Sequence, residues 1–356
     1  MTLRDLVAFS LSCSSPVKKA CALSALTEGV AEAPPDVLDC LLDLVDARES
    51  ASALRARSDE LLARGAASGM TAIGFDDPRF PPRLRTLVDA PLVLWVAGSP
   101  ALLPSRAVAI VGSRAASPYG LEVAERLGYD LAAAGVTVVS GLARGCDGAA
   151  HRGALDARGP TVAVVGCGAD ICYPAEHAPL RHEIASTGAV LSELPPGTPP
   201  LPHHFPLRNR LISGLSHAVI VVEASDKSGS LITANYALHQ GREVMAVPGT
   251  ILGARHRGSH ALLRDGAQLV ESAADVLTAL GWSPTGSAVA ADTSAHGAET
   301  LLDWLTPGEA VDLDWLVLRT GRSAADVLSS LMRLELNGVV CRAPGGGFLR
   351  TSRQVV

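Results

Sequence analysis

Six short apolar runs between residues 105 and 282 alternate with stretches of helical spacing, and this alternation constrains the fold more than any other feature. Several of the runs are continuous in Val and Ile, as in strands that are buried on both faces of a parallel sheet. Strands that alternate with helices build doubly wound α/β sheets. The predicted strands are 107–111, 136–140, 161–165, 189–191, 218–223 and 243–247.

The N-terminal part of the chain has a different pattern. Residues 1–70 carry apolar side chains at helical spacing, among them Leu38, Leu41 and Leu42, and predict a small helical (SAM-like) domain. Residues 71–104 change character and include a β-rich run at 92–96, which leads into the core. We therefore expect the core domain to span 71–282.

The C-terminal part begins with small and polar residues. The composition of 283–299 predicts a flexible linker. In 300–356, Ser323 and Asp326 resemble a capping box before an apolar-periodic run, and Asn337-Gly338 and a short strand pair around 345–347 follow. This order of two helices and a hairpin predicts a winged-helix domain over 300–356.

The charge balance limits how the chain can bind a polyanion. With 30 Lys and Arg against 36 Asp and Glu, the net charge is −6, which excludes a histone-like basic coat. A local basic groove can still occur on a protein of negative net charge. Such a groove must be small and built from Arg side chains and backbone amides. The seven Cys include no C-x-x-C pair, so we expect no disulfide framework, no metal site and a reducing, cytoplasmic location. We also expect no signal peptide and no membrane span.

Glycine, serine and arginine follow the predicted strands at their carboxyl ends. In an open α/β sheet these ends meet at one edge, where ligands bind. Glycine permits close approach of backbone, and helix N-termini offer free amides to anions. The sequence therefore predicts a phosphate site at this edge, built from Gly112, Ser113, Arg114, Ser117, Gly141, Arg144, Gly145, Gly166, Ser228, Gly229 and Ser230.

The common nucleotide-binding and catalytic motifs do not occur in these loops. The first turn reads GSRAAS rather than G-x-G-x-x-G, and the strand at 136–140 ends without an acidic residue for a ribose. A Walker A loop, a G-x-S-x-G elbow and an H-E-x-x-H motif are also absent from the sequence. We therefore expect no nicotinamide or other cofactor.

Several polar residues near the same edge allow two interpretations each. Arg208, Asn209 and Arg210 form either a phosphate clamp or a set that pairs internally and shapes the groove. Glu193 and Glu223 could act as an acid/base pair in glycosidic chemistry, but we favour a bracing role because carboxylates in a groove would repel phosphates. The pair at 203–204 is either a ligand contact or plain surface, and we expect His151 to be packed in a helix.

Six segments carry a resemblance to a known family. They are AIVGSRAASPYG (109–120), VVSGLARGCDGAAHRGAL (138–155), GADICYPAEH (168–177), FPLRNRLISGLS (205–216), SGSLITANYAL (228–238) and GREVMAVPG (241–249). In these segments, and over essentially all of 71–275, the sequence closely resembles the DprA/Smf family of DNA-processing proteins. The resemblance implies an α/β fold with an extended Rossmann-like doubly wound sheet. A helical N-terminal domain and a C-terminal winged helix both occur in family members.

The resemblance also implies a function without catalysis. Family members bind and protect single-stranded DNA during natural transformation and load the RecA recombinase onto it, even with single-strand binding protein present. They commonly act as homodimers through the core. Carried over by position, the phosphate pocket uses Gly112, Ser113 and Arg114, with the 141–145 loop and 228–230 beside it. Tyr173 and Phe205 are the candidates for base stacking, worth about 1–3 kcal/mol per base.

The chain departs from the family pattern at two places. Many relatives carry a basic residue after the Tyr-Pro pair, where this chain has Ala175, and we suggest that Arg181 supplies the missing charge. A Cys-Asn pair common near 256–260 is replaced by Ser259-His260.

Two other functions stay open at this point. One is a nucleotide phosphoribohydrolase, an enzyme of related fold. Against it, the Pro-Gly-Gly-x-Gly-Thr turn of such enzymes is only partly echoed by the segment at 248–250. The other is a protein-docking scaffold that uses the winged helix and the N-terminal domain.

Overall fold

The structure is a computed structural model that describes residues 1–12, 15–19, 21–22, 37–45, 47–103, 106–283, 301–305, 310–320, 324–336, 339–343 and 347–351. It divides into two compact units, Met1–Ser287 and Ala288–Val356, which are described separately. The predicted linker lies outside the described residues except for Ser283, and so do Ser323, Asn337-Gly338 and the glycines at 345–346.

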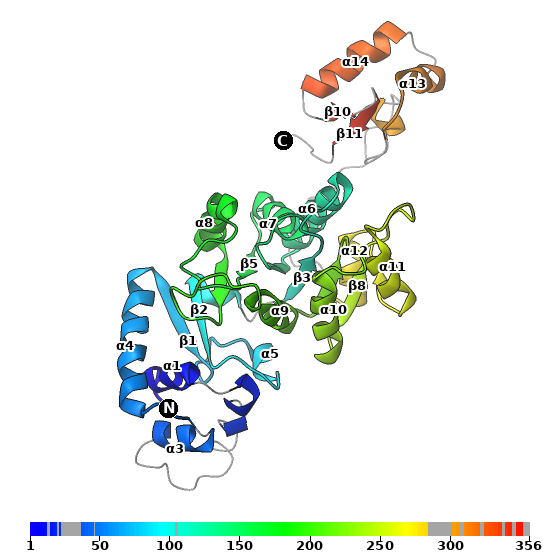
Figure 1. The fold of residues 1–356 in the computed structure, drawn as a ribbon. Coiled ribbons are helices and arrows are strands. Elements are labelled where there is room, and N and C mark those ends of the chain that lie inside the picture. Colours follow the sequence, from blue (N-terminus) through cyan, green and yellow to red (C-terminus); the bar gives the residue numbers. More distant parts are fainter. Residues whose placement is uncertain are drawn as a thin grey trace. The chain divides into compact units, whose positions relative to one another are not determined.

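The first unit is built on a sheet of nine strands in the described part of the chain (Figure 1). Its order is β1-β2-β6-β5-β4-β3-β7-β8-β9. The strands are β1 (Met70–Gly74), β2 (Val93–Gly98), β3 (Ala107–Val111), β4 (Thr137–Ser140), β5 (Thr161–Val164), β6 (Ala189–Ser192), β7 (Ala218–Val221), β8 (Glu243–Ala246) and β9 (Gln268–Leu269). The six predicted strands are β3 to β8, and the doubly wound sheet is confirmed.

The order of the strands places a topological switch point beside β3. From β6 to β9 the neighbouring strands pair in parallel, with β3 between β4 and β7. The chain builds β4, β5 and β6 outward on one side of β3 and then returns to form β7 on the other side. Ligands of open α/β sheets bind at the carboxyl ends of the strands at such a point.

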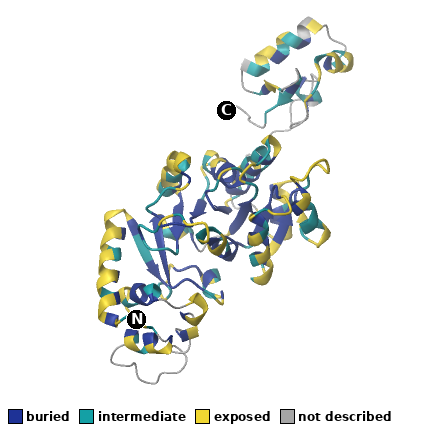
Figure 2. Cartoon of the chain, in the orientation of Figure 1, coloured by how far each residue is buried: buried dark blue, intermediate teal, exposed yellow. Residues whose placement is uncertain are grey.

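Helices cover both faces of this sheet. On one face, α5 (Pro82–Arg85), α9 (His204–Leu215) and α10 (Ser230–His239) pack on alternate strand residues such as Ala109 and Val111. On the other face, α6 (Pro118–Ala133), α7 (Cys146–Asp156) and α12 (Ala273–Ala279) pack on Val108 and Ile110. The central strands are therefore buried on both sides, as their continuous apolar runs predict (Figure 2). The remaining helices of the core are α8 (Ala178–Thr187), α11 (Arg257–Arg264) and the 3-10 helices η1 (Pro100–Leu102) and η2 (Ala175–His177).

The N-terminal helices pack on the sheet extension formed by β1 and β2. The helices are α1 (Leu3–Leu11), α3 (Val37–Leu44) and α4 (Ala51–Ala67). Phe9, Leu41 and Leu54 share a core with Trp95 of β2, and a Cβ on Gly65 of α4 would lie 2.8 Å from the Trp95 ring. Residues 1–70 and the sheet thus lie in one compact unit, and β1 begins at the predicted boundary.

The second unit contains two helices followed by a hairpin. After the 3-10 helix η3 (Leu301–Trp304) come α13 (Leu313–Thr320), α14 (Ala324–Leu336), β10 (Val340–Arg342) and β11 (Phe348–Arg350). The two strands pair antiparallel, and Val311 bridges to Phe348. Leu316, Val327 and Leu331 form its core with Phe348.

None of the helices that the structure describes has the length and apolar character needed to cross a membrane.

Candidate functional site

The loops after β3 and β7 meet at the switch point through Glu223. This carboxylate is 1% exposed and accepts hydrogen bonds from the Ser117 backbone N–H (3.1 Å) and the Ser117 hydroxyl (2.5 Å). The same hydroxyl caps α6 by accepting from the Gly120 N–H at 3.1 Å. Glu223 therefore braces the first helix of the site, as we expected, and Arg255 lies 3.6 Å from its carboxylate.

The loops after β3 and β4 pack directly on one another. The Cys146 N–H donates to the Ser113 carbonyl at 3.2 Å. Gly145 has φ +73°, and a Cβ there would collide with the same carbonyl. A Cβ on Gly112 would meet the Cys146 sulfur at 2.5 Å. These glycines are required because two backbones approach each other at this edge.

Arg114, Phe205 and Tyr173 form an open platform from three separate segments. The Arg114 guanidinium lies 5.3 Å from the centroid of the Phe205 ring, and the Phe205 and Tyr173 centroids are 5.3 Å apart. Phe205 rests on Gly166, where a Cβ would lie 3.0 Å from the ring. Tyr173 is 41% exposed and Arg114 is also exposed. Arg114, which we predict to bind phosphate, thus lies together with both predicted stacking residues beside the ends of β3 and β5.

Arg208 points into the sheet rather than into the groove. Its side chain is 6% exposed, and Nη1 donates to the carbonyls of Gly141 (2.8 Å) and Val164. Asp147 accepts from the Gly141 N–H at 3.1 Å on the same loop. Burial lowers the pKa of Arg208 to about 10, while the Asp147 carboxylate opposes this shift. Arg208 therefore fastens the carboxyl ends of β4 and β5.

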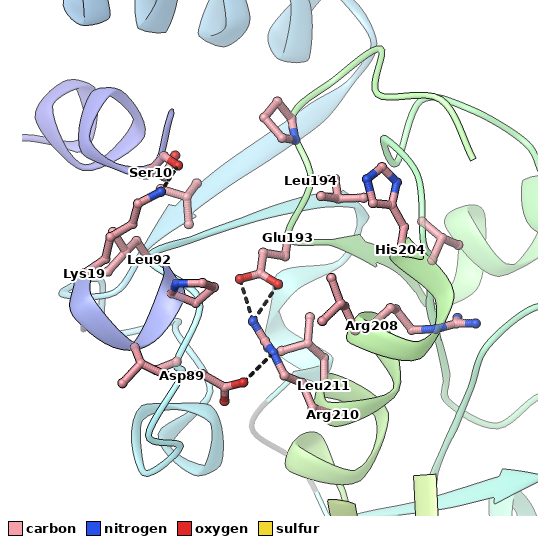
Figure 3. Close-up of a pocket in the computed structure, with 17 residues that line it drawn as sticks. Ser10, Lys19, Asp89, Leu92, Glu193, Leu194, His204, Arg208, Arg210 and Leu211 are labelled. Atoms are coloured by element: carbon pink, nitrogen blue, oxygen red, sulfur yellow. Dashed lines mark hydrogen bonds and ion pairs between the residues drawn. The ribbon is translucent and has the colours of Figure 1, made fainter. Parts of the chain in front are cut away.

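Arg210 is also internal, on the other side of α9. It is 3% exposed and forms ion pairs with Glu193 (2.7 Å) and Asp89 (3.0 Å). Figure 3 shows its guanidinium between these carboxylates in the wall of a cavity of about 350 Å³, while Arg208 extends away from that cavity. The geometry of Arg208 and Arg210 therefore agrees with internal pairing and not with a phosphate clamp. Glu193 accordingly braces Arg210.

Asn209 lies between the two arginines and faces the loop after β7. Its side-chain amide donates to the Gly229 carbonyl at 3.4 Å. In that loop the Ser228 and Ser230 hydroxyls are hydrogen-bonded at 2.7 Å, and α10 begins at Ser230. The loop at 228–230 is thus joined to the start of α9, beside the platform.

Two of the predicted cations pair with groups in the segment that follows β5. Arg144 is exposed and forms an ion pair with Glu176, and this hydrogen bond lowers the pKa of Glu176 to about 2. Arg181 donates to the Ala169 carbonyl. Ala175 is exposed at the start of η2. Arg181 therefore lies against the loop after β5 and holds it, rather than extending toward the platform as a replacement charge.

Three residues of this edge were not predicted from the sequence. Asp147 and Glu176 pair with predicted cations or amides, and Arg255 donates to the Ala115 carbonyl at 2.8 Å. An acidic residue directly after the Arg144-Gly145 turn was the available signal for Asp147. Among the described residues, no group of three His, Cys, Asp or Glu side chains is placed to hold a metal ion.

Comparisons with known proteins agree with this geometry. The sequence profile of the DNA recombination-mediator protein A family matches residues 71–281. The chain belongs to this family. The profile of the DprA winged helix domain matches residues 286–346, so the predicted winged helix and the DprA/Smf resemblance are both confirmed.

Relatives of known sequence and structure extend the match beyond the core. Protein Smf of Escherichia coli is 40% identical over 289 residues, which cover 78% of this chain and 76% of that protein. DNA processing protein DprA of Streptococcus pneumoniae is 46% identical over 201 residues, 56% of this chain and 71% of that protein.

Two solved structures share the DprA fold. The X-ray structure of DNA processing protein A from Streptococcus pneumoniae has a TM-score of 0.69 at 36% identity and covers 78% of this chain and 98% of its own. DNA processing protein A from Helicobacter pylori, described for its single-stranded DNA binding mode, is the second. Its structure has a TM-score of 0.54 at 30% identity and covers 59% of this chain and 95% of its own.

Proposed function

We propose that this DprA-family chain binds single-stranded DNA across the carboxyl edge of its sheet, at the platform of Arg114, Phe205 and Tyr173. The observation that carries the proposal is the platform itself. A guanidinium and two aromatic rings from separate loops lie together, and Arg114 has no carboxylate partner among the described residues. The relative from Helicobacter pylori, which binds single-stranded DNA, supports the same function.

The chemistry of the edge suits a strand of unpaired nucleotides. Arg114 and the loops at 112–116 and 228–230 contact phosphates, while the exposed Tyr173 ring offers a face on which a base can stack. With few aromatic side chains, affinity rests mainly on phosphates and depends strongly on salt. Preference for single strands follows from stacking on Tyr173, because the bases of a duplex are already stacked on one another.

The carboxylates of the site argue against the hydrolase alternative. Glu223 is engaged with Ser117, and Glu193 with Arg210. A glycosidic acid/base pair needs two carboxyl groups that flank a substrate and are open to it. We therefore propose that the chain acts without catalysis and without a cofactor.

In the cell, we propose that the protein protects single-stranded DNA and loads RecA onto it during natural transformation, with single-strand binding protein as a further partner and a cytoplasmic location. We also propose a homodimer through the core. Support comes from the edge strand β9, where Leu269 is exposed, and from the loop after β8, where Ile251 and Leu252 are 85% and 81% exposed. Exposed apolar side chains around an open strand edge are a common site of association.

The proposed binding is tested by fluorescence anisotropy with a labelled 35-mer single strand and its matched duplex, at low and moderate salt. We expect tight, salt-sensitive binding with a clear preference for the single strand. Equal affinity for the duplex would indicate that the winged helix is the main DNA contact. Deletion of 284–356 then tests whether duplex binding depends on that domain. Absence of binding would refute the proposal, and release of free adenine from AMP would then support the hydrolase.

A further inference from the structure

A second group of cationic side chains lies at the opposite, amino-terminal edge of the same sheet. Arg106 directly precedes β3, His217 precedes β7, and Arg242 precedes β8. Arg83 belongs to α5, which packs on α9 through Leu84. These four residues, here called the amino-edge cluster, come from four separate segments of the chain.

Hydrogen bonds and ring contacts hold the residues of the cluster in two pairs. The Arg242 guanidinium donates to the carbonyls of Arg83 (3.3 Å) and Gly214 (3.4 Å). Arg106 lies 5.5 Å from the centroid of the Trp282 ring, and the His217 ring meets Trp282 edge-on with centroids 4.7 Å apart. The Arg83 and Arg242 side chains and His217 are half-buried, whereas Arg106 is exposed.

In the described part of the chain, no carboxylate is paired with these charges. Among the described residues, none of the four side chains forms an ion pair with a carboxylate, and the Arg83 guanidinium has no hydrogen-bond partner. The Nε of Arg242 is buried and has no hydrogen-bond partner either. The pKa of His217 is lowered to about 4, first by burial and then by Arg83, Arg242 and Arg106, which together make the local potential positive.

Helix ends explain part of this arrangement. Helices α9 and α10 end close to the cluster, at Leu215 and His239, and their carbonyl ends attract cations. Arg242 is one such cation, because it donates to the Gly214 carbonyl at the end of α9. The guanidiniums of Arg83 and Arg106 do not cap either helix. A partly buried charge without a counterion costs free energy, and a bound anion offsets that cost.

We propose that the amino-edge cluster is a second anion site, which binds a phosphoryl group between Arg83, Arg106, Arg242 and His217. Guanidiniums recognise phosphate oxygens through paired, charge-assisted hydrogen bonds. The phosphoryl group comes either from a nucleic-acid strand or from free phosphate. The site is independent of the platform at the carboxyl edge, so it stands whether or not the proposed function is correct.

The first test uses inorganic phosphate as the probe on the full chain. The His217 imidazole nitrogens are followed by NMR at pH 7.5, assigned with His217→Gln, while phosphate replaces chloride at constant ionic strength. We expect a saturable shift of the His217 resonances, because a bound phosphate changes the electric field and the hydrogen bonding at the ring. In Arg83→Ala/Arg106→Ala the phosphate affinity falls by about tenfold or more, since the substitutions remove two charge-assisted hydrogen-bonding groups.

The matched control is Arg126→Ala/Arg152→Ala, which removes the same charge from the exposed faces of α6 and α7. It leaves the phosphate response unchanged. Arg83→Lys, which keeps the charge, retains part of the response, and urea unfolding of Arg83→Ala/Arg106→Ala confirms that the double variant is folded. A phosphate response that is absent from the wild type, or equal in the wild type and the Arg83→Ala/Arg106→Ala variant, refutes the site and leaves Arg242 alone with a role, at the end of α9.

The source of the phosphoryl group is distinguished with a labelled 35-mer single strand. If a strand supplies it, the slope of log affinity against log salt becomes shallower in Arg83→Ala/Arg106→Ala, by about 0.7 for each phosphate that the two arginines neutralise in the wild type. If free phosphate is the ligand, the slope is unchanged while the NMR response still disappears. Failure of the proposed function would instead appear as absence of strand binding with the phosphate response at His217 intact.

Discussion

Replacement of Arg114 by alanine tests the platform most directly. The wild-type guanidinium is exposed and lies over Phe205, and among the described residues it has no ion pair. The substitution removes one charge-assisted hydrogen bond to a phosphate, worth about 1.5–3 kcal/mol. This corresponds to a roughly 10- to 150-fold weaker affinity for single-stranded DNA.

Because Arg114 is exposed and forms no ion pair among the described residues, the free energy of unfolding is expected to change by less than about 0.5 kcal/mol, as for other surface substitutions. Affinity is measured by fluorescence anisotropy with a 35-mer over a series of salt concentrations. The salt slope should become shallower by about 0.7, which is the contribution of one neutralised phosphate. The stability is measured by urea unfolding of the same preparation.

Arg79→Ala is the matched control, since Arg79 is equally exposed but pairs with Asp77 at 2.6 Å, outside the platform. It should leave the affinity and the salt slope unchanged. Arg114→Lys should recover part of the affinity, because it keeps the charge but not the planar stacking on the ring. A folded Arg114→Ala protein with wild-type affinity and slope would refute the assignment of this residue to the DNA site.

Four further predictions concern the residues that hold the site. Arg210→Ala leaves two carboxylates without their buried partner and should lower the free energy of unfolding by about 3 kcal/mol in urea. Glu223→Gln weakens the brace on Ser117, and we expect a loss of about 1–3 kcal/mol together with weaker strand binding in the anisotropy assay. Gly145→Ala forces a side chain into a positive φ against a carbonyl and should cost at least about 1–2 kcal/mol, measured as a lower Tm. Burial lowers the pKa of His151 from its ordinary value of 6.5 to about 3, so the folded protein keeps this ring neutral. The free energy of unfolding therefore falls as the pH drops below 6.5, by about 2 kcal/mol between pH 8 and pH 5. His151→Gln should flatten this dependence in unfolding experiments at several pH values.

The sheet could be predicted only where its strands are buried on both faces. Continuous Val and Ile runs identify β3 to β8, because only a strand covered on both sides tolerates them. The run at 92–96 was also recognised, but its role as β2 was not, because its antiparallel pairing with β6 is decided by tertiary contacts rather than by the run itself. Strand β9 has two residues, which is too short for any periodic pattern.

The site was predictable from its loops and less so from its charges. Gly112, Ser113 and Arg114 were predicted from the end of a strand and the aromatic pair was named alongside the family resemblance, and Arg114 lies beside both rings. Arg144 and Arg181, by contrast, are held by Glu176 and by a carbonyl of their own neighbourhood, and these contacts depend on how the loop at 166–177 folds back. A sequence shows which cations stand near an edge, but not which of them already have a partner.

The segment at 208–210 shows why this limit is physical. Successive residues of an α-helix are rotated by about 100°, so three consecutive side chains on α9 point in three directions. Arg208 meets the carbonyls at the ends of β4 and β5, Asn209 meets the loop at Gly229, and Arg210 meets Glu193 and Asp89. The two arginines differ in partners although they are alike in sequence, because the helix is packed among three different surfaces. Their charges are therefore used to shape the edge, which leaves Arg114 as the guanidinium of the platform that is open to a phosphate.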